Sequence, residues 1–403
     1  MPHHFAPPDQ RPVVLTLGLA QTLAWASSFY LPAVLATPIA RDLGISRPAV
    51  FALLSMALIV AALVGPMAGR RVDQHGGRPV LLLSSGLFAL GLLLLAAAPS
   101  WPLLALGWAV LGLAMGCGLY DTAFAALVHL YGRGARQSIT GITLLAGFAS
   151  TVGWPLTALM DSHWGWRGAC LGWAALHLVL GWPLNARLPR RAALLHAPPG
   201  LPGTPPAHRE AVVEDEPPTA AAAPRFMAAL LALLFTLMGF VSTSIATHLP
   251  ALLQAGGVPL AAAVGVAALA GPAQVAARLF EFGVLRRFSP LLSARLATLG
   301  HPLGAVLLLV LGPLAAVPFV IVHGLGNGLL TIVRGTLPLA LFGPSGYGAR
   351  QGWIALPGRI VGALSPWVFG LALDHWGVGA LWWTLAAGTL SLGVLIALRL
   401  PGH

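Results

Sequence analysis

Long apolar runs separated by short polar breaks dominate the chain, and they form two groups of six. The first group lies at Val13–Leu35, Pro48–Ala68, Pro79–Ala98, Pro102–Leu130, Ile139–Met160 and Gly168–Leu184, and the second at Phe226–His248, Pro259–Phe280, Leu291–Leu311, Leu314–Leu341, Trp353–Leu373 and Ala380–Leu398. A helix needs roughly 20 predominantly apolar residues to cross a bilayer. Because hydrocarbon offers backbone amides no partner, such runs form helices and not open strands. The pattern predicts an all-α membrane protein with twelve transmembrane helices.

The overall composition agrees with a bilayer as the solvent. Apolar residues make up 57% of the 403 positions and charged residues only 8%, whereas about a quarter of the residues in a soluble domain are charged. The chain therefore has too few polar side chains to cover a soluble core of this size. We expect a multi-pass protein of the bacterial inner membrane.

The one clearly polar stretch separates the two groups of runs. It covers residues 187–225, is rich in proline and alanine, and carries an acidic cluster at Glu210, Glu214, Asp215 and Glu216. Such a composition buries too little apolar surface to fold alone. We therefore predict a six-helix bundle at residues 1–186, a flexible cytoplasmic linker at 187–225 and a second six-helix bundle at 226–403.

All 22 basic residues are arginines, and most of them fall in segments on one side of the predicted helices. Arg70, Arg71, Arg133 and Arg350 are examples. Cytoplasmic loops of membrane proteins carry an excess of basic residues, so this asymmetry places both termini in the cytoplasm. The same asymmetry accounts for the net charge of +11, which therefore does not indicate nucleic-acid binding.

Short segments of the first half recur in the second half in the same order. Leu31-Pro32-Ala33 recurs as Leu249-Pro250-Ala251, Gly65-Pro66 as Gly271-Pro272, Gly134-Ala135-Arg136-Gln137 as Gly348-Ala349-Arg350-Gln351, and Asp161-Ser162-His163-Trp164-Gly165, one residue shorter, as Asp374-His375-Trp376-Gly377. This order indicates a duplicated six-helix unit. Parallel repeats around an axis along the membrane normal place a substrate site at their interface, near the midplane.

The loop between the second and third runs carries a motif. Its sequence fits the pattern Gly-x-x-x-Asp-x-x-Gly-x-Arg through Gly69, Asp73, Gly76 and Arg78. The loop resembles the signature loop of the major facilitator superfamily, although Gln74 stands where an arginine often follows the aspartate. The resemblance implies two pseudo-symmetric six-helix bundles and a permease for small molecules. It also implies that helices one, four, seven and ten line a central cavity.

The motif residues are candidates for a cytoplasmic gate. Asp73 ends the second helix, where its carboxylate can accept hydrogen bonds from arginines or from a nearby helix N-terminus. The glycines permit a tight loop and close helix contact. Arg278 and Glu281 occupy the second-half counterpart of this region, and we include them in the predicted gate. There are two alternatives to a gate. The arginines of the loop could serve only to fix the membrane topology, and Arg278 and Glu281 could extend toward lipid headgroups.

Charged residues inside the runs are candidates for a substrate or proton site, because a charge in the membrane is costly and often marks a pathway. Asp121, Arg334 and Arg359 lie at comparable depth, roughly two turns from the cytoplasmic ends of helices four, ten and eleven. Asn327 and Thr331 share a helical face with Arg334. We predict that Asp121 faces Arg334. The alternative is a purely structural ion pair.

The balance of these charges favours an anionic substrate. Arg278, Arg334 and Arg359 outnumber the acidic residues Asp121, within a run, and Glu281, directly after one. This leaves a surplus of positive charge and makes Asp121 the candidate protonation site. Gln21 and Trp25 share one face of the first helix and are further candidates for substrate contact.

We therefore predict a secondary active transporter that moves a small anionic or amphipathic molecule across the inner membrane by alternating access, in proton-coupled efflux. An uptake permease for organic anions, similar to the monocarboxylate branch, and a transporter-like sensor without flux are the alternatives. The sequence has no clustered metal ligands, no paired carboxylates and no lysine for a phosphate-binding loop. We expect no enzymatic activity, no cofactor and no metal, and a monomer in the lipid bilayer.

Overall fold

The apolar runs form α-helices in the computed structural model, which describes residues 9–189 and 222–398. In the first half the helices are α1 (Gln10–Ala26), α2 (Leu31–Leu43), α3 (Arg47–His75), α4 (Gly77–Ala96), α5 (Trp101–Gly118), α6 (Tyr120–Tyr131), α7 (Ala135–Ala146), α8 (Ala149–Leu176) and α9 (Trp182–Ala186). In the second half they are α11 (Ala222–Ala255), α12 (Leu260–Ala267), α13 (Ala270–Gly283), α14 (Pro290–Leu311), α15 (Ala316–Phe342), α16 (Tyr347–Trp376) and α17 (Leu381–Ala397). No strand occurs in the described ranges.

These elements make twelve crossings, which confirms the predicted number of transmembrane helices. Some crossings consist of two helices: α1 with α2 is the first, α5 with α6 the fourth, and α12 with α13 the eighth. Conversely, α8 contains the end of the fifth crossing and the start of the sixth, which meet at a kink at Gly165, where φ is 67°. The helical stretch Trp101–Ala186, 86 residues long, therefore carries crossings four to six.

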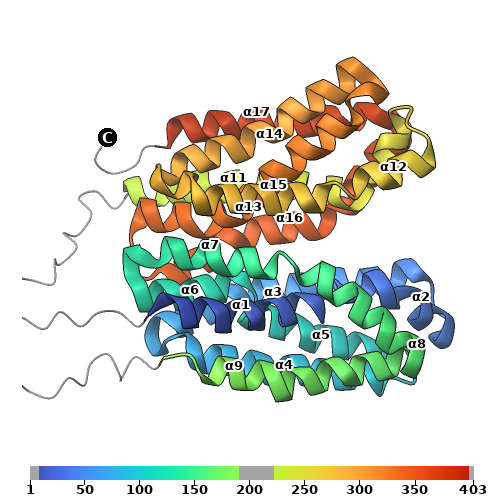
Figure 1. The fold of residues 1–403 in the computed structure, drawn as a ribbon, viewed down its shortest axis with the longest axis vertical. Helices are drawn as coiled ribbons and strands as arrows, with labels where there is room; N and C mark the ends of the chain where they lie inside the picture. Colours follow the sequence, from blue (N-terminus) through green and yellow to red (C-terminus); the bar gives the residue numbers. More distant parts are fainter. Residues whose placement is uncertain (1–8, 190–221, 399–403) are drawn as a thin grey trace, which may run out of the picture.

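Each half has its own hydrophobic core. Trp108 and Trp173 belong to the core of the first half, and Phe319 and Phe369 to that of the second. Figure 1 shows the halves as two separate bundles, with the first half in blue to green below and the second in yellow to red above. Because lipid tails are as apolar as these side chains, close packing and not burial from water holds each bundle together.

Both halves begin and end at the same end of the molecule. The ends of the described segments lie at the left in Figure 1. We call this end of the molecule the terminal face and the other end the opposite face. A third hydrophobic cluster joins the halves near the terminal face, where Val72 and Leu127 meet Leu339 and Tyr347. Toward the opposite face the two bundles diverge (Figure 1). The halves therefore contact each other mainly near the terminal face.

Three crossings of the first half, the first, fourth and fifth, are interrupted within the bundle. α1 gives way to α2 through a turn at residues 27–30, α5 to α6 at Leu119, and α7 to α8 at Gly147 and Phe148. Discontinuous helices near the middle of the membrane are typical of substrate and ion sites in transporters, because they place helix ends and free backbone groups there. The breaks therefore make the boundary between the halves the candidate region for such a site.

The break between α5 and α6 is held by side chains. Leu119 adopts an extended conformation with φ −86° and ψ −170°, so carbonyl groups at the end of α5 lose their helical partners. Gln21 Nε2 donates a hydrogen bond to the Gly118 carbonyl oxygen at 2.6 Å, and Thr122 Oγ1 donates to that of Gly116 at 3.0 Å. These bonds stabilise the interruption.

The predicted linker at residues 187–225 lies mainly outside the described residues, as does the whole acidic cluster from Glu210 to Glu216. α9 ends at Ala186. α11 begins at Ala222, which is earlier than the predicted start of the second bundle at residue 226. The alanines and the proline at this boundary extend the helix, because alanine is the best helix former and proline is tolerated in the first turn.

Candidate functional site

Asp121 lies in the first turn of α6, directly after the break at Leu119. The N-terminus of a helix carries the positive end of its dipole, so the broken crossing favours an ionised carboxylate at this position. The Arg359 guanidinium of α16 forms a salt bridge with the carboxylate, and Gln351 Nε2 lies 3.5 Å from Asp121 Oδ1. Arg359 also donates to the Ala61 carbonyl oxygen of α3 at 3.2 Å. Asp121 thus links the fourth crossing to the eleventh.

The salt bridge to Arg359 corrects the predicted pairing of Asp121 with Arg334. The Arg334 guanidinium is directed toward α11, where a Cβ added at Gly239 would lie 3.4 Å from Nη2. Among the described residues, no carboxylate lies within 4 Å of this guanidinium, and it donates no hydrogen bond. Sequence spacing gives the depth of a side chain but not the rotation of its helix, and Arg359 was predicted at the same depth.

Asn327 and Thr331, predicted on one face with Arg334, make hydrogen bonds within the second half. Ser242 Oγ of α11 donates to Asn327 Oδ1 at 2.5 Å, and Thr331 Oγ1 donates to the Asn327 carbonyl oxygen at 3.1 Å. Both side chains are half-buried. The Asn327 amide nitrogen has no hydrogen bond within the described ranges, so it is the group of this pair that a ligand could engage.

The two candidates on the first helix have different positions. Gln21 is 1% exposed and supports the break at Gly118 from within the first half, so it does not line the boundary. Trp25 is half-buried, and its ring centroid lies 4.9 Å from that of Tyr120, the neighbour of Asp121. Of the two, only Trp25 approaches the first turn of α6 with its side chain.

Asp73 lies against the N-terminus of α16 in the other half. Its carboxylate oxygens accept hydrogen bonds from the N–H groups of Gly348 and Ala349, each at 2.8 Å. These N–H groups have no partner within their own helix, and the carboxylate also meets the positive end of the helix dipole. A Cβ added at Gly69 would lie 2.0 Å from the Gly348 carbonyl oxygen. α3 and α16 therefore approach backbone to backbone.

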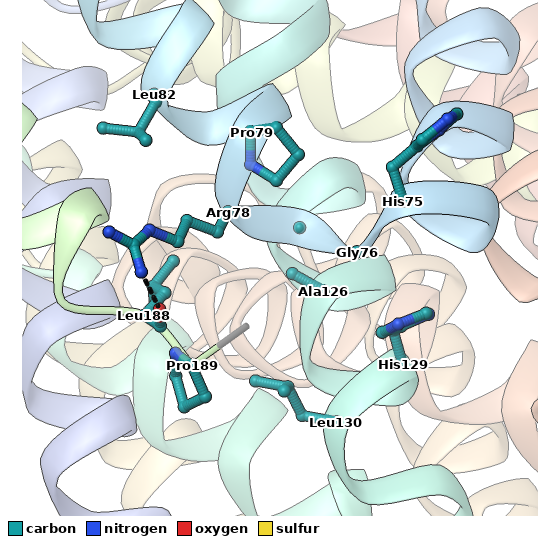
Figure 2. A pocket seen from close by; sticks show the side chains of 11 residues that line it. His75, Gly76, Arg78, Pro79, Leu82, Ala126, His129, Leu130, Leu188 and Pro189 are labelled. Atoms are coloured by element: carbon teal, nitrogen blue, oxygen red, sulfur yellow. Dashed lines mark hydrogen bonds between the residues drawn. The ribbon is translucent and has the colours of Figure 1, made fainter. Parts of the chain in front are cut away.

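Gly76 and Arg78 shape the loop but do not reach the second half. Gly76 has φ 82°, which glycine adopts readily, and it is the single residue between the end of α3 and the start of α4. Arg78 Nη1 lies 3.5 Å from the Leu188 carbonyl oxygen, where the chain leaves α9. Figure 2 shows Arg78 on the wall of a cavity of about 320 Å³, between this loop, α6 and residues 188–189. Asp121 does not line this cavity.

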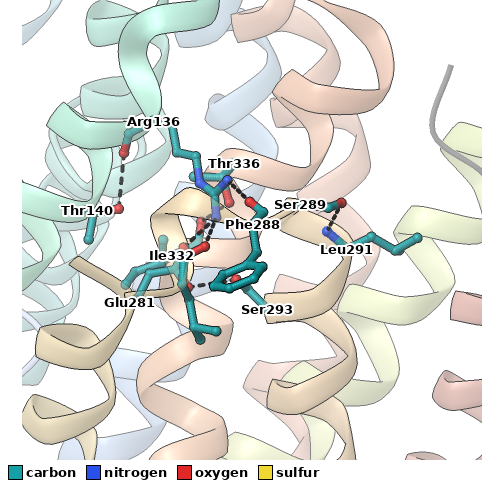
Figure 3. A network of polar contacts seen from close by, with 10 residues as sticks. Arg136, Thr140, Glu281, Phe288, Ser289, Leu291, Ser293, Ile332 and Thr336 are labelled. Atoms are coloured by element: carbon teal, nitrogen blue, oxygen red, sulfur yellow. Dashed lines mark hydrogen bonds and ion pairs between the residues drawn. The ribbon is translucent and has the colours of Figure 1, made fainter. Parts of the chain in front are cut away.

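A second link between the halves is the salt bridge from Arg136 at the start of α7 to Glu281 on α13 (Figure 3). Arg136 Nη2 lies 2.8 Å from Glu281 Oε1 and donates to the Leu285 carbonyl oxygen at 3.1 Å, while Ser293 Oγ donates to Glu281 Oε2 at 2.7 Å. Glu281 is 0% exposed, so protein groups and not water compensate its charge. Sequence reasoning placed Glu281 in the gate but missed Arg136.

The internal repeat relates the two links. Asp73 ends the second crossing and meets the start of the eleventh, whereas Glu281 near the end of the eighth crossing meets the start of the fifth. The segments 134–137 and 348–351, identical in sequence, begin crossings five and eleven. This identity was the signal that could have pointed to Arg136. The halves are joined near the terminal face at two symmetry-related places.

Arg278, assigned to the same gate, lies deeper in the bundle. It is 7% exposed, and its Nη1 lies 2.1 Å from where a Cβ at Gly147 would be. Gly147 directly follows the last residue of α7, and the C-terminal end of a helix dipole favours a cation. Arg278 Nε has no hydrogen-bond partner, and no carboxylate of the described chain lies within 4 Å. Arg278 is thus a buried cation at a helix break and does not extend to headgroups.

The Glu281→Gln variant is expected to weaken the link to Arg136. Glutamine keeps the size of the side chain but leaves the Arg136 charge without its counterion, and breaking one partner of a buried pair costs about 3 kcal/mol. We expect a lower midpoint of thermal unfolding in detergent. The double variant Arg136→Gln/Glu281→Gln removes both charges and should recover most of the loss. Equal midpoints for the wild type and Glu281→Gln would show that the link adds no stability.

Comparison with known proteins identifies a family over most of the chain. A model of the Major Facilitator Superfamily matches residues 17–322, from the first crossing into the tenth. The purine ribonucleoside efflux pump NepI of Escherichia coli O1:K1 / APEC is 28% identical over 178 residues, which are 44% of this chain and 42% of that pump. The match therefore spans less than half the length of this relative.

Solved structures share the fold over nearly the whole chain. The human organic anion transporter MFSD10 (TETRAN) superposes with a TM-score of 0.69 at 16% identity, covering 96% of this chain and 100% of that one. The proton:xylose symporter XylE, bound to 6-bromo-6-deoxy-D-glucose, superposes with a TM-score of 0.74 at 12% identity, covering 96% and 95%. At these identities the likeness concerns the fold alone.

Proposed function

The chain belongs to the Major Facilitator Superfamily, and we propose that it is a proton-coupled exporter of a small anionic or amphipathic organic molecule. The observation that carries this proposal is the pair of arginines near the boundary between the halves, Arg278 and Arg334, which have no carboxylate within 4 Å among the described residues. A cation removed from water is stable only with a counterion or hydrogen-bond acceptors. A bound organic anion supplies both.

Asp121 is the proposed proton site. Protonation neutralises its carboxylate and ends the salt bridge that joins it to Arg359 across the boundary. An anion beside Arg359 competes for the same guanidinium. Proton and substrate therefore act on one contact between the halves, and each changes the free-energy difference between conformations only through its different affinity for them.

We further propose that the terminal face is the cytoplasmic face of a bacterial inner membrane, which the excess of arginines on that side supports. The structure, with the links of Asp73 and Arg136 formed, then corresponds to the outward-facing state of a monomer. Residues 1–186 and 226–403 act as the two moving bundles and residues 187–225 as their tether. The export function of the relative NepI supports the direction. Uptake of an organic anion is the second candidate, because an outward-facing site also receives substrate from outside.

Transport by purified protein in liposomes, driven by an imposed pH gradient, tests the proposal. We expect accumulation of organic anions in the direction opposite to proton flow, and uptake with proton flow would favour the second candidate. Binding without flux would identify a sensor. If both Asp121→Asn and Arg334→Ala retain full proton-coupled transport, the proposed site is wrong.

The Arg334→Ala variant is expected to bind the transported anion about 10- to 100-fold more weakly, because a hydrogen bond to a charged group contributes about 1.5–3 kcal/mol. The apparent KM for transport measures this change. Arg287→Ala is the matched control, since it removes an arginine that is exposed in the loop before α14. Similar losses in both variants would indicate a general effect of net charge and would contradict a role for Arg334 in binding.

A further inference from the structure

Five aromatic rings form a continuous series along the first half. The Phe124 and Tyr120 rings are stacked with centroids 5.3 Å apart, Tyr120 lies 4.9 Å from Trp25, Trp25 lies 6.3 Å from Tyr30, and Tyr30 lies 5.9 Å from Trp154. We call this series the aromatic ladder. It runs from α6 across the first crossing to α8, and it passes two helix breaks, at Leu119 and at residues 27–30.

The ladder begins at the boundary between the halves. Phe124 touches the second half, because a Cβ added at Gly335 of α15 would lie 2.7 Å from its ring. Tyr120 lies four residues earlier and therefore on the same face of α6, next to Asp121 with its salt bridge to Arg359. Tyr120, Trp25 and Tyr30 are all half-buried. Part of the surface of each of these three side chains is therefore accessible in this structure.

The ladder also has unused hydrogen-bonding groups. Neither the Tyr30 nor the Tyr120 hydroxyl makes a hydrogen bond within the described residues, and Trp25 Nε1 is buried without a partner. Tyrosine and tryptophan usually find a partner for these groups inside a protein. A series of rings that served only to pack the bundle would not require three polar groups without hydrogen-bond partners.

Arg278 provides the charge beside the ladder. Its guanidinium lies at the end of α7, against Gly147. Thr22 of α1 donates a hydrogen bond from Oγ1 to the carbonyl oxygen of Leu145, two residues before Gly147, at 3.3 Å, so the end of α7 packs against the helix that carries Trp25. Arg278 is 7% exposed, its Nε has no partner, and no carboxylate in the described ranges lies within 4 Å. An apolar, flat surface and a buried cation thus occur together at the boundary.

We propose that the aromatic ladder and Arg278 bind a planar aromatic anion, with the ring of the ligand stacked on the ladder and its carboxylate or phosphate on the guanidinium. This assignment rests on the proposed export of an anionic or amphipathic molecule and specifies its chemical class. Stacking requires the flat π face of the ligand ring, which a saturated ring lacks. The positive charge of Arg278 requires an anionic ligand, and the amide that corresponds to each acid is neutral.

Matched ligands separate these requirements. Binding of benzoate, cyclohexanecarboxylate and benzamide to the purified protein is measured by calorimetry, and the naphthalene series 1-naphthoate, decahydronaphthalene-1-carboxylate and 1-naphthamide is measured in parallel. We expect the aromatic acid of at least one series to bind about 10-fold or more tightly than both of its analogues. Equal affinity for the aromatic and the saturated acid overturns the inference but leaves the proposed function standing. Binding of no acid in either series also overturns the inference, whereas the proposed function is decided by transport of organic anions in liposomes.

Variants locate the site. Tyr120→Ala should weaken binding of the aromatic acid about 3- to 10-fold, as expected for the loss of one stacked ring, and should leave the affinity for the saturated acid unchanged. Tyr120→Phe keeps the ring and should bind nearly as the wild type does. Arg278→Gln should abolish the preference for the acid over the amide. Trp367→Ala, which removes a ring 69% exposed on α16, is the control. An aromatic preference that survives Tyr120→Ala and Arg278→Gln overturns the assignment.

Discussion

In the Gly69→Ala variant, we expect the terminal face to open. The added Cβ would lie 2.0 Å from the carbonyl oxygen of Gly348 and 2.3 Å from its carbonyl carbon. Both are backbone atoms of α16, so no side-chain rotation relieves the clash, and the helices must separate. Overpacking a close contact costs about 3 kcal/mol at the upper end of its usual range, which corresponds to a shift of roughly 100-fold away from the closed state.

The distance between spin labels at Gln74 and Ser345 measures this opening. Both positions are exposed, at the end of α3 and just before α16, and we expect the distribution of distances to move to larger values. Gly348→Ala should have the same effect, because its Cβ would lie 2.4 Å from the Gly69 carbonyl oxygen. Gly283→Ala is the control, since no atom lies within 4 Å of a Cβ there. An unchanged distance between the labels in both Gly69→Ala and Gly348→Ala would contradict close backbone packing in the closed state.

The salt bridge between Asp121 and Arg359 is expected to contribute about 2 kcal/mol to the stability of the closed state, less than the roughly 3 kcal/mol that breaking a fully buried pair costs. The side chains are 17% and 27% exposed, so solvent screens the pair in part. The variants Asp121→Asn and Arg359→Gln should each lower the unfolding midpoint, and their combination should lower it by less than the sum. A double-mutant cycle measures this coupling.

Transport separates the structural role of this pair from its role in proton coupling. A stable double variant Asp121→Asn/Arg359→Gln should lose the acceleration of transport by a pH gradient, because no group titrates at position 121. The pair Asp42 and Arg167, 43% and 39% exposed, is the matched control, and exposed pairs contribute roughly 0–1 kcal/mol. Retained pH dependence in the double variant would place the proton site elsewhere. Equal coupling energies in the two pairs would contradict a special role for Asp121.

The parts of the site that were predictable are those that depend on position along one helix. The depth of Asp121, Arg334 and Arg359 follows from a constant rise per residue, and the place of Asp73 at the end of the second crossing follows from the loop pattern. The interaction partners of these side chains could not be predicted in the same way. Asp121 meets Arg359 and not Arg334 because α15 turns Arg334 toward Gly239, and helix rotation depends on packing in the whole bundle.

The helix breaks illustrate a second limit of prediction from the sequence. The apolar run Pro102–Leu130 is continuous in hydropathy, yet the crossing is interrupted at Leu119. The interruption is stable because Gln21, distant in sequence, donates a hydrogen bond to the Gly118 carbonyl oxygen. A pattern read along one run contains no information about such a partner. The aromatic ladder was missed for the same reason, since its rings come from three separate crossings.

The sequence by itself determined the twelve crossings, the duplication of a six-helix unit and the motif loop. Lipid imposes helices on every apolar run, and the repeat and the loop are local patterns of residues. Only the tertiary structure decided which residues meet across the two halves: Asp73 with the start of α16, Arg136 with Glu281, and Asp121 with Arg359. These contacts depend on the rotation, breaks and close approach of helices, which are set by packing between segments far apart in the chain.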